Sequence, residues 1–257
     1  MAKHDAVSDE ALARALAGYA GMVQKVLTDP ERWLGTDGEP DASAGLGDRA
    51  LDAVRDRALG EVTPASPDWA QLPLEQRVDW WVGRIGLSAG LAAAAPRFAG
   101  ALADRVPLQA ALGASAAGLA VCAVAREHGV TAAEDWVPLL AKVLTDRDLP
   151  PQSEQVPTPE ASEQALAEEG EDDVDDAEEG QPSRAATLGR GAQRAGRTLW
   201  RLARTFLELQ HLLEERPRGG FLARTLAKLP VVGVAGGWLD ERGGIRKAAR
   251  ETAALLG

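Results

Sequence analysis

Apolar residues recur along this chain at the three- and four-residue intervals of amphipathic helices, and no stretch keeps the period of two that marks a half-buried strand. Ala, Leu and Val carry most of the apolar content, and Ala and Leu favour the helix. Runs of β-branched or aromatic residues with the length of a strand do not occur. The pattern therefore predicts an all-α protein.

Capping residues and helix breakers divide the pattern into segments. Ser8 is placed to cap a first helix, Thr131–Glu134 has the composition of a capping box, and Gly129 suits a left-handed helix end. Pro73 suits the first turn of a helix, whereas Pro138 should kink its helix or move the start of that helix. The expected helices span, by residue number, about 8–27, 47–59, 73–95, 107–128, 131–144, 184–215, 221–229 and 244–256.

An uncharged run extends from Val106 to Ala125 and has about the length that a bilayer-spanning helix needs. More than half of it is Ala, Gly and Ser, which contribute little to membrane insertion. We interpret the run as a core helix that is buried on all sides. A re-entrant or interfacial hairpin with residues 85–96 is the alternative.

Small residues in two of these helices are spaced so that two helix backbones can approach closely. Gly86 and Gly90 are four residues apart on one helix face. In the next long helix Gly113 and Ala117 have the same spacing, and Gly118 pairs in this way with an alanine. We expect these residues to serve the packing of the two helices within the core, although membrane helix dimers use the same spacing.

The helix expected at 184–215 carries two different faces. Its apolar seam has heptad spacing and consists of Leu188, Ala192, Ala195, Leu199, Leu202, Phe206, Leu209 and Leu213. Its arginine ridge consists of Arg190, Arg194, Arg197, Arg201 and Arg204. Each arginine follows the seam by two positions, or roughly 200° of rotation, so the ridge lies nearly opposite the seam.

Each face has two interpretations. The seam either packs on the core or pairs with a helix of a partner protein. The ridge is either a solvated face or the complement of an anionic surface, and five arginines without an interleaved acid are unusual for a solvated face. Phospholipid headgroups and the acidic segment of this chain are the favoured complements. Nucleic acid is disfavoured, because no helix-turn-helix spacing, zinc motif or aromatic platform accompanies the ridge.

The net charge of −11 is unevenly distributed. Residues 150–183 hold 12 acids, five prolines and no base, whereas residues 184–257 hold 14 bases and six acids. We predict that 150–183 is a disordered acidic linker. Residues 1–72 then form an N-terminal helical extension with loops. Residues 73–149 and 184–257 form the two halves of a single discontinuous helical domain.

Few residues offer catalytic chemistry. The single cysteine, Cys122, excludes an internal disulfide and lies in an apolar run that predicts a buried, inert thiol. None of the three histidines has a partner at metal-ligand spacing, and no phosphate-binding loop or nucleophile motif occurs. The sequence therefore predicts a non-enzymatic protein without cofactor or metal. The polar N-terminus argues against a secretory signal, so we expect a cytoplasmic location.

Several segments of the chain resemble the EcsC family of bacterial proteins. They are Arg84–Gly90, Gly100–Asp104, Ala125–Gly129 and Leu229–Gly236, the last followed by a basic final helix. The resemblance covers roughly 80–149 and 225–257. It implies an α-helical, membrane-associated protein with no established catalytic residues.

Two functions follow as expectations. In the first, a peripheral protein contacts lipid at the inner face of the membrane through its Gly-rich helices and the arginine ridge. In the second, a cytosolic scaffold pairs with a partner through the part of the seam from Leu199 to Leu213. The acidic linker then acts as an autoinhibitory or partner-binding arm.

Overall fold

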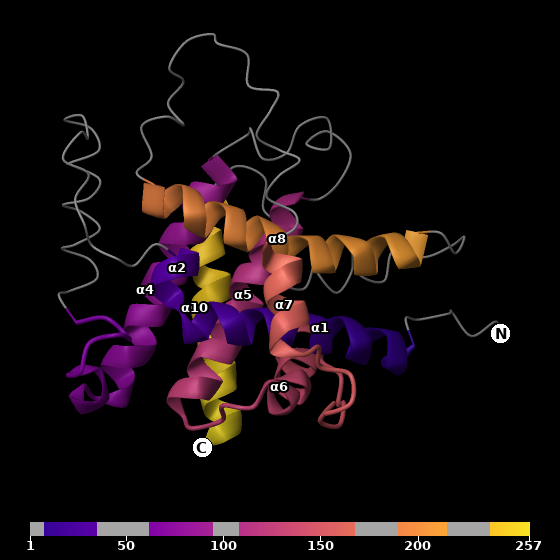
Figure 1. Cartoon of the computed structure of the whole chain (residues 1–257), viewed down its shortest axis with the longest axis horizontal. Helices are drawn as coiled ribbons and strands as arrows, with labels where there is room; N and C mark the ends of the chain where they lie inside the picture. The colour runs from indigo at the N-terminus through magenta and orange to yellow at the C-terminus, as the bar shows by residue number, and fades with distance from the viewer. Residues whose placement is uncertain (1–7, 35–61, 95–107, 168–189, 215–236) are drawn as a thin grey trace, which may run out of the picture.

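The computed structural model describes residues 8–34, 62–94, 108–167, 190–214 and 237–257, which are coloured in Figure 1. Within these ranges 79% of the residues are helical, and no strand occurs among them, so the predicted all-α class is confirmed. The helices are α1 (Asp9–Thr28), α2 (Pro30–Leu34), the 3₁₀ turn η1 (Trp69–Gln71), α4 (Leu74–Ala94), α5 (Leu108–Glu127), α6 (Ala133–Thr145), α7 (Pro159–Ala167), α8 (Arg190–Glu214) and α10 (Gly237–Leu256). The helices expected at 47–59 and 221–229 lie outside the described residues.

Helix α5 is the centre of the fold. Every residue from Ala111 to Ala125 is buried, and α1, α4, α6, α8 and α10 all contact this helix. In Figure 1, α1 and α8 lie across α5 and α10. The interpretation of the uncharged run as a core helix is therefore confirmed over residues 111–125. No helix in the described ranges is both long enough and apolar enough to cross a membrane.

Tyr19 of α1 packs into a notch on α5. Its side chain is fully buried, and its hydroxyl donates a hydrogen bond of 2.5 Å to the Ser115 carbonyl. A Cβ atom at Gly118 would lie 2.8 Å from the Tyr19 hydroxyl oxygen, so only glycine fits there without a shift. The ring meets Phe206 of α8 edge to face, with centroids 5.0 Å apart. Burial raises the pKa of Tyr19 well above its ordinary value and keeps the hydroxyl protonated.

The closely spaced small residues of α4 and α5 contribute to more than one helix–helix contact. Gly86 of α4 and both Gly113 and Ala117 of α5 are buried, and these two helices contact each other. Gly118 differs from our expectation, because it accommodates α1 through Tyr19. Gly90 also lies in α4, but the structure does not describe its surroundings.

Helix α1 belongs to the core. Its buried face extends from Leu12 to Leu27, and it contacts α5, α6, α7 and α8. Helix α1 contacts α5 and α6 of the first predicted half and α8 of the second. The segment before residue 72 therefore contributes to the core and is not only an extension of it. Ser8 caps α1 as predicted, since its hydroxyl accepts a hydrogen bond from the Ala11 amide.

The short helix α2 is not among the helices expected above, because a proline directly after a helical segment is typical of a helix end. Proline is also favoured in the first turn of a helix, and Pro30 is the first residue of α2. The last carbonyls of α2 are satisfied by distant side chains. Arg84 of α4 donates to the Leu34 carbonyl at 2.8 Å, and Thr198 of α8 donates to the Trp33 carbonyl at 2.7 Å.

The predicted linker is wrong over its first half, because residues 150–167 are ordered and include α7. Leu166 is fully buried, and α7 packs on α1. Glu163 forms ion pairs with Lys25 at 3.3 Å and with Arg32 at 2.8 Å. Prolines and acids dominate the composition of 150–183 as a whole, which hid this short segment with one buried leucine. Residues 168–183 lie outside the described part.

Two other helix starts, those of α6 and α10, differ from the prediction. Helix α6 has Ala132 as its N-cap without a side-chain hydrogen bond, so the expected capping box does not form. Pro138 lies inside α6 and does not delay its start. Helix α10 includes residues from Gly237 onward, seven residues before the expected start. The described part of α8 starts at Arg190, within the predicted helix. Gly129, two residues after the end of α5, has a φ of 90°, which confirms the left-handed conformation expected at this helix end.

The Tyr19 notch predicts opposite effects for the same substitution at two helical glycines. Gly118→Ala should lower the free energy of unfolding by about 1–3 kcal/mol, because the new methyl group overpacks Tyr19. Gly83→Ala adds a methyl group at an exposed site of α4 with no atom within 4 Å, so it should raise stability by about 1 kcal/mol. Urea unfolding followed by circular dichroism measures both. Equal stability of the two variants would contradict the packing of α1 on α5.

Candidate functional site

The apolar seam of α8 is buried in the protein itself. Ala195, Leu199 and Leu202 are at most 2% exposed, and Phe206 is 8% exposed. Helix α8 contacts α1, α2, α4 and α5 with this face. The first interpretation of the seam is therefore confirmed for these residues, and Leu199, Leu202 and Phe206 have no surface left for a partner helix. Leu209 and Leu213 lie in α8, but their side chains are outside the described residues.

The arginine ridge lies on the outer side of α8. Arg197 and Arg204 are exposed, and Arg194 and Arg201 are half-buried. These four arginines also interact with other groups of the chain. Arg190 is the first residue of α8, and its side chain is not among those described. Since the opposite face is fixed in the core, the structure holds the ridge at the surface.

The charge of the ridge has a single sign over a long stretch. From residue 190 to residue 207 the helix contains five arginines and no acidic residue, and Glu208 is the first acid. On a rigid helix these guanidinium groups project at intervals of about 5 Å, because three or four residues make one turn. Guanidinium binds phosphate and carboxylate with two parallel hydrogen bonds, so such a surface is suited to a layer of anionic groups.

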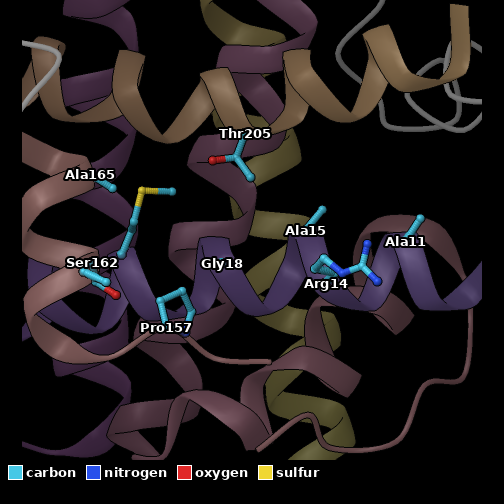
Figure 2. A pocket seen from close by; sticks show the side chains of 10 residues that line it. Ala11, Arg14, Ala15, Gly18, Pro157, Ser162, Ala165 and Thr205 are labelled. Carbon is cyan, nitrogen blue, oxygen red and sulfur yellow. The ribbon is translucent and has the colours of Figure 1, made fainter. Parts of the chain in front are cut away.

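A cavity of about 350 Å³ lies between α1, α7 and α8 (Figure 2). Its volume is within the range of small-molecule sites, about 300–1,000 Å³. One wall is a stripe of α1 with the four- and three-residue spacing of a helix face: Ala11, Ala15, Gly18 and Met22. Thr205 of α8 extends toward this stripe from the opposite side. Sequence reasoning missed the cavity, because three helices far apart in the chain form it.

A second cluster joins η1, α4 and α5 through the carboxylate of Glu127. Its oxygens accept hydrogen bonds from the indole nitrogens of Trp69 at 3.3 Å and Trp81 at 2.9 Å, and from Arg77 at 2.5 Å. The side chain of Glu127 is only 6% exposed. The Trp80 ring packs at right angles on Trp81 with centroids 5.0 Å apart. The buried carboxylate accepts hydrogen bonds from three donors and so holds η1, α4 and α5 together. We therefore assign this cluster a structural role.

The described residues contain little else with catalytic chemistry. Cys122 is fully buried, and burial raises the pKa of its thiol well above the ordinary value, which agrees with the predicted inert thiol. His128 follows the end of α5. No group of three or more His, Cys, Asp or Glu side chains within the described ranges could hold a metal ion.

Comparison of the chain with protein-family models, with curated proteins and with solved structures found no match. The resemblance to the EcsC family therefore stays a hypothesis that rests on the sequence alone.

The burial of the seam predicts the effect of shortening its side chains. Leu199→Ala should lower the free energy of unfolding by about 2–5 kcal/mol, because it leaves a cavity beside α5. Arg197→Ala, on the opposite face of the same helix, should change stability by about 0.5 kcal/mol or less. Thermal or urea unfolding measures both. A Leu199→Ala variant as stable as the wild type would mean that the seam is free for a partner.

Proposed function

We propose that this protein contacts anionic membrane surfaces peripherally, with the arginine ridge of α8 facing the lipid headgroups. The observation that carries the proposal is the combination of two faces on one helix. The seam is buried in the core, and the opposite face presents arginines without an interleaved acid. Clustered arginines at a protein surface are attracted by the negative potential of anionic membranes.

The contact is local, because the chain as a whole carries a net charge of −11. A basic residue near an anionic bilayer contributes about 1 kcal/mol, and the effect decays within a Debye length of about 8–10 Å. Acidic groups elsewhere on the molecule are screened at larger distances. The proposal therefore requires an orientation in which α8 lies nearest to the membrane.

The seam is already buried, so membrane contact through the ridge requires no unfolding of α8. Binding then depends on headgroup electrostatics, and high salt should reverse it. The cytoplasmic leaflet carries the anionic lipids that such a ridge prefers. The resemblance to the EcsC family, which implies membrane association, points in the same direction.

The proposal predicts that neutralising the ridge abolishes binding to anionic vesicles. The test variant is Arg194→Gln, Arg197→Gln and Arg204→Gln, which removes three charges and keeps a good helix former at each position. At about 1 kcal/mol for each charge, the partition coefficient should fall by roughly 100-fold. Co-sedimentation with phosphatidylserine-containing vesicles at low salt measures this, and phosphatidylcholine vesicles should bind neither protein.

A matched control removes the same charge from another surface. Arg246, Lys247 and Arg250 are exposed on α10, so replacing all three by Gln gives an identical net charge. This control should bind anionic vesicles almost as well as the wild type. If both triple variants lose binding equally, the interaction reflects total charge and the assignment to α8 is wrong. If neither loses binding, the arginines of α8 form only a solvated face.

A further inference from the structure

A run of acidic residues precedes the arginine ridge in the chain. Residues 168–183, the acidic run, hold nine acids and no base, and Arg190 follows seven residues after Ser183. The proposed membrane contact uses the ridge and leaves the acidic run without a role. Guanidinium binds carboxylate and phosphate alike, so a series of carboxylates offers the ridge the same chemistry as a layer of anionic headgroups.

Helix α7 anchors the chain directly before the acidic run. Its last residue is Ala167, and the neighbouring Leu166 is fully buried. Glu163 joins α7 to α1 and α2 through ion pairs with Lys25 at 3.3 Å and with Arg32 at 2.8 Å. The acidic run therefore starts at a fixed point of the fold.

The chain on either side of the acidic run is fixed at the two ends of the ridge. Ala165 of α7 and Thr205 of α8 line the same cavity (Figure 2). The chain thus leaves α7 near the position that follows Arg204, the last arginine of the ridge. After the run, the chain enters the described part of α8 at Arg190, the first arginine of the ridge.

The connection is long enough for its carboxylates to reach every arginine of the ridge. From Arg190 to Arg204 the ridge covers 14 residues of helix, or about 21 Å. Ten residues separate Glu179, the last acid of the run, from Arg190, and they span up to about 33 Å when extended. The nine carboxylates also outnumber the five guanidinium groups, so the run can neutralise the whole ridge.

Four arginines of the ridge already have partners within the protein. Arg194, Arg197, Arg201 and Arg204 each interact with another group of the chain. Lipid headgroups therefore reach these guanidinium groups in competition with groups of the protein itself. An occupant that belongs to the same chain has an advantage in this competition, because its effective concentration is on the order of millimolar.

We propose that the acidic run binds the arginine ridge and competes there with anionic membranes. Docking neutralises the basic face of α8 in the absence of lipid, and a strongly anionic surface displaces the run. A ridge that is free in only about one molecule in ten binds lipid about tenfold more weakly than a ridge that is always free. The competition rests on the proposed membrane contact, whereas the docking of the run on α8 does not.

The docking is tested without lipid, by a nitroxide label on the acidic run of the full chain. Val174→Cys introduces the labelling site, and the native Cys122 is fully buried and does not compete for the label. Paramagnetic broadening of backbone amide signals in NMR spectra measures how near the label is to α8. The amides of residues 194–204 should be broadened at low salt, and the broadening should decrease when about 0.5 M salt screens the charges.

The matched background for this measurement lacks three charges of the ridge: Arg194→Gln, Arg197→Gln and Arg204→Gln. In this background the amides of α8 should recover most of their intensity, because the run has lost its complement. Broadening of equal strength in the two backgrounds, or no broadening of α8 in the wild-type background, would overturn the docking.

A second experiment measures the competition, by co-sedimentation with phosphatidylserine-containing vesicles at low salt. The test variant replaces four acids of the run: Asp172→Asn, Asp173→Asn, Asp175→Asn and Asp176→Asn. The matched control removes the same charge from four exposed acids elsewhere: Glu75→Gln, Asp79→Asn, Asp135→Asn and Glu154→Gln. The test variant should bind about tenfold more tightly than the control. Equal binding of the two variants would contradict the competition.

The two experiments separate this inference from the proposed function. If no variant binds anionic vesicles while the label on the run still broadens α8, the membrane contact is wrong and the docking stands. If the wild type binds vesicles and the label does not broaden α8, the docking is wrong and the membrane contact stands.

Discussion

The burial of α5 on every side is the constraint from which the rest of the structure follows. A helix can have five helical neighbours only if its side chains are small enough for the backbones to approach, and α5 consists largely of Ala, Gly and Ser. Tyr19 lies over Gly118 because nothing larger than hydrogen is present there. The Ser115 carbonyl accepts the Tyr19 hydroxyl, and the Ser115 hydroxyl donates to the Leu199 carbonyl of α8 at 3.4 Å.

These contacts fix the parts of the molecule to which we assign function. The contact of α8 with α5 buries the apolar seam, and the arginine ridge consequently faces outward. Helix α1 uses its faces for α5, α6 and α7, and the stripe that includes Gly18 lines the cavity beside Thr205 of α8. The proposed membrane face and the cavity between α1, α7 and α8 are thus both consequences of how α1 and α8 cross the central helix.

The features that the sequence predicted are local in the chain. The helical class, the Ser8 cap, the buried run within α5 and the burial of the α8 seam all follow from spacing within one segment. The features that it missed join distant segments. Trp69 and Trp81 converge on Glu127 from 58 and 46 residues away, and Glu163 reaches Lys25 across 138 residues. Because composition and periodicity do not encode which distant elements meet, neither the packing of α7 on α1 nor the cavity beside it could be predicted.

The most direct test of the central proposal is the position of α8 relative to headgroups when the protein is bound to a membrane. Cys122 is fully buried, so a fluorophore can be attached selectively at Arg197→Cys or, on α10, at Arg250→Cys. We predict strong quenching of the label at position 197 by anionic vesicles that carry a headgroup quencher, and weak quenching at position 250. Equal quenching at both positions, or stronger quenching at 250, would contradict the account.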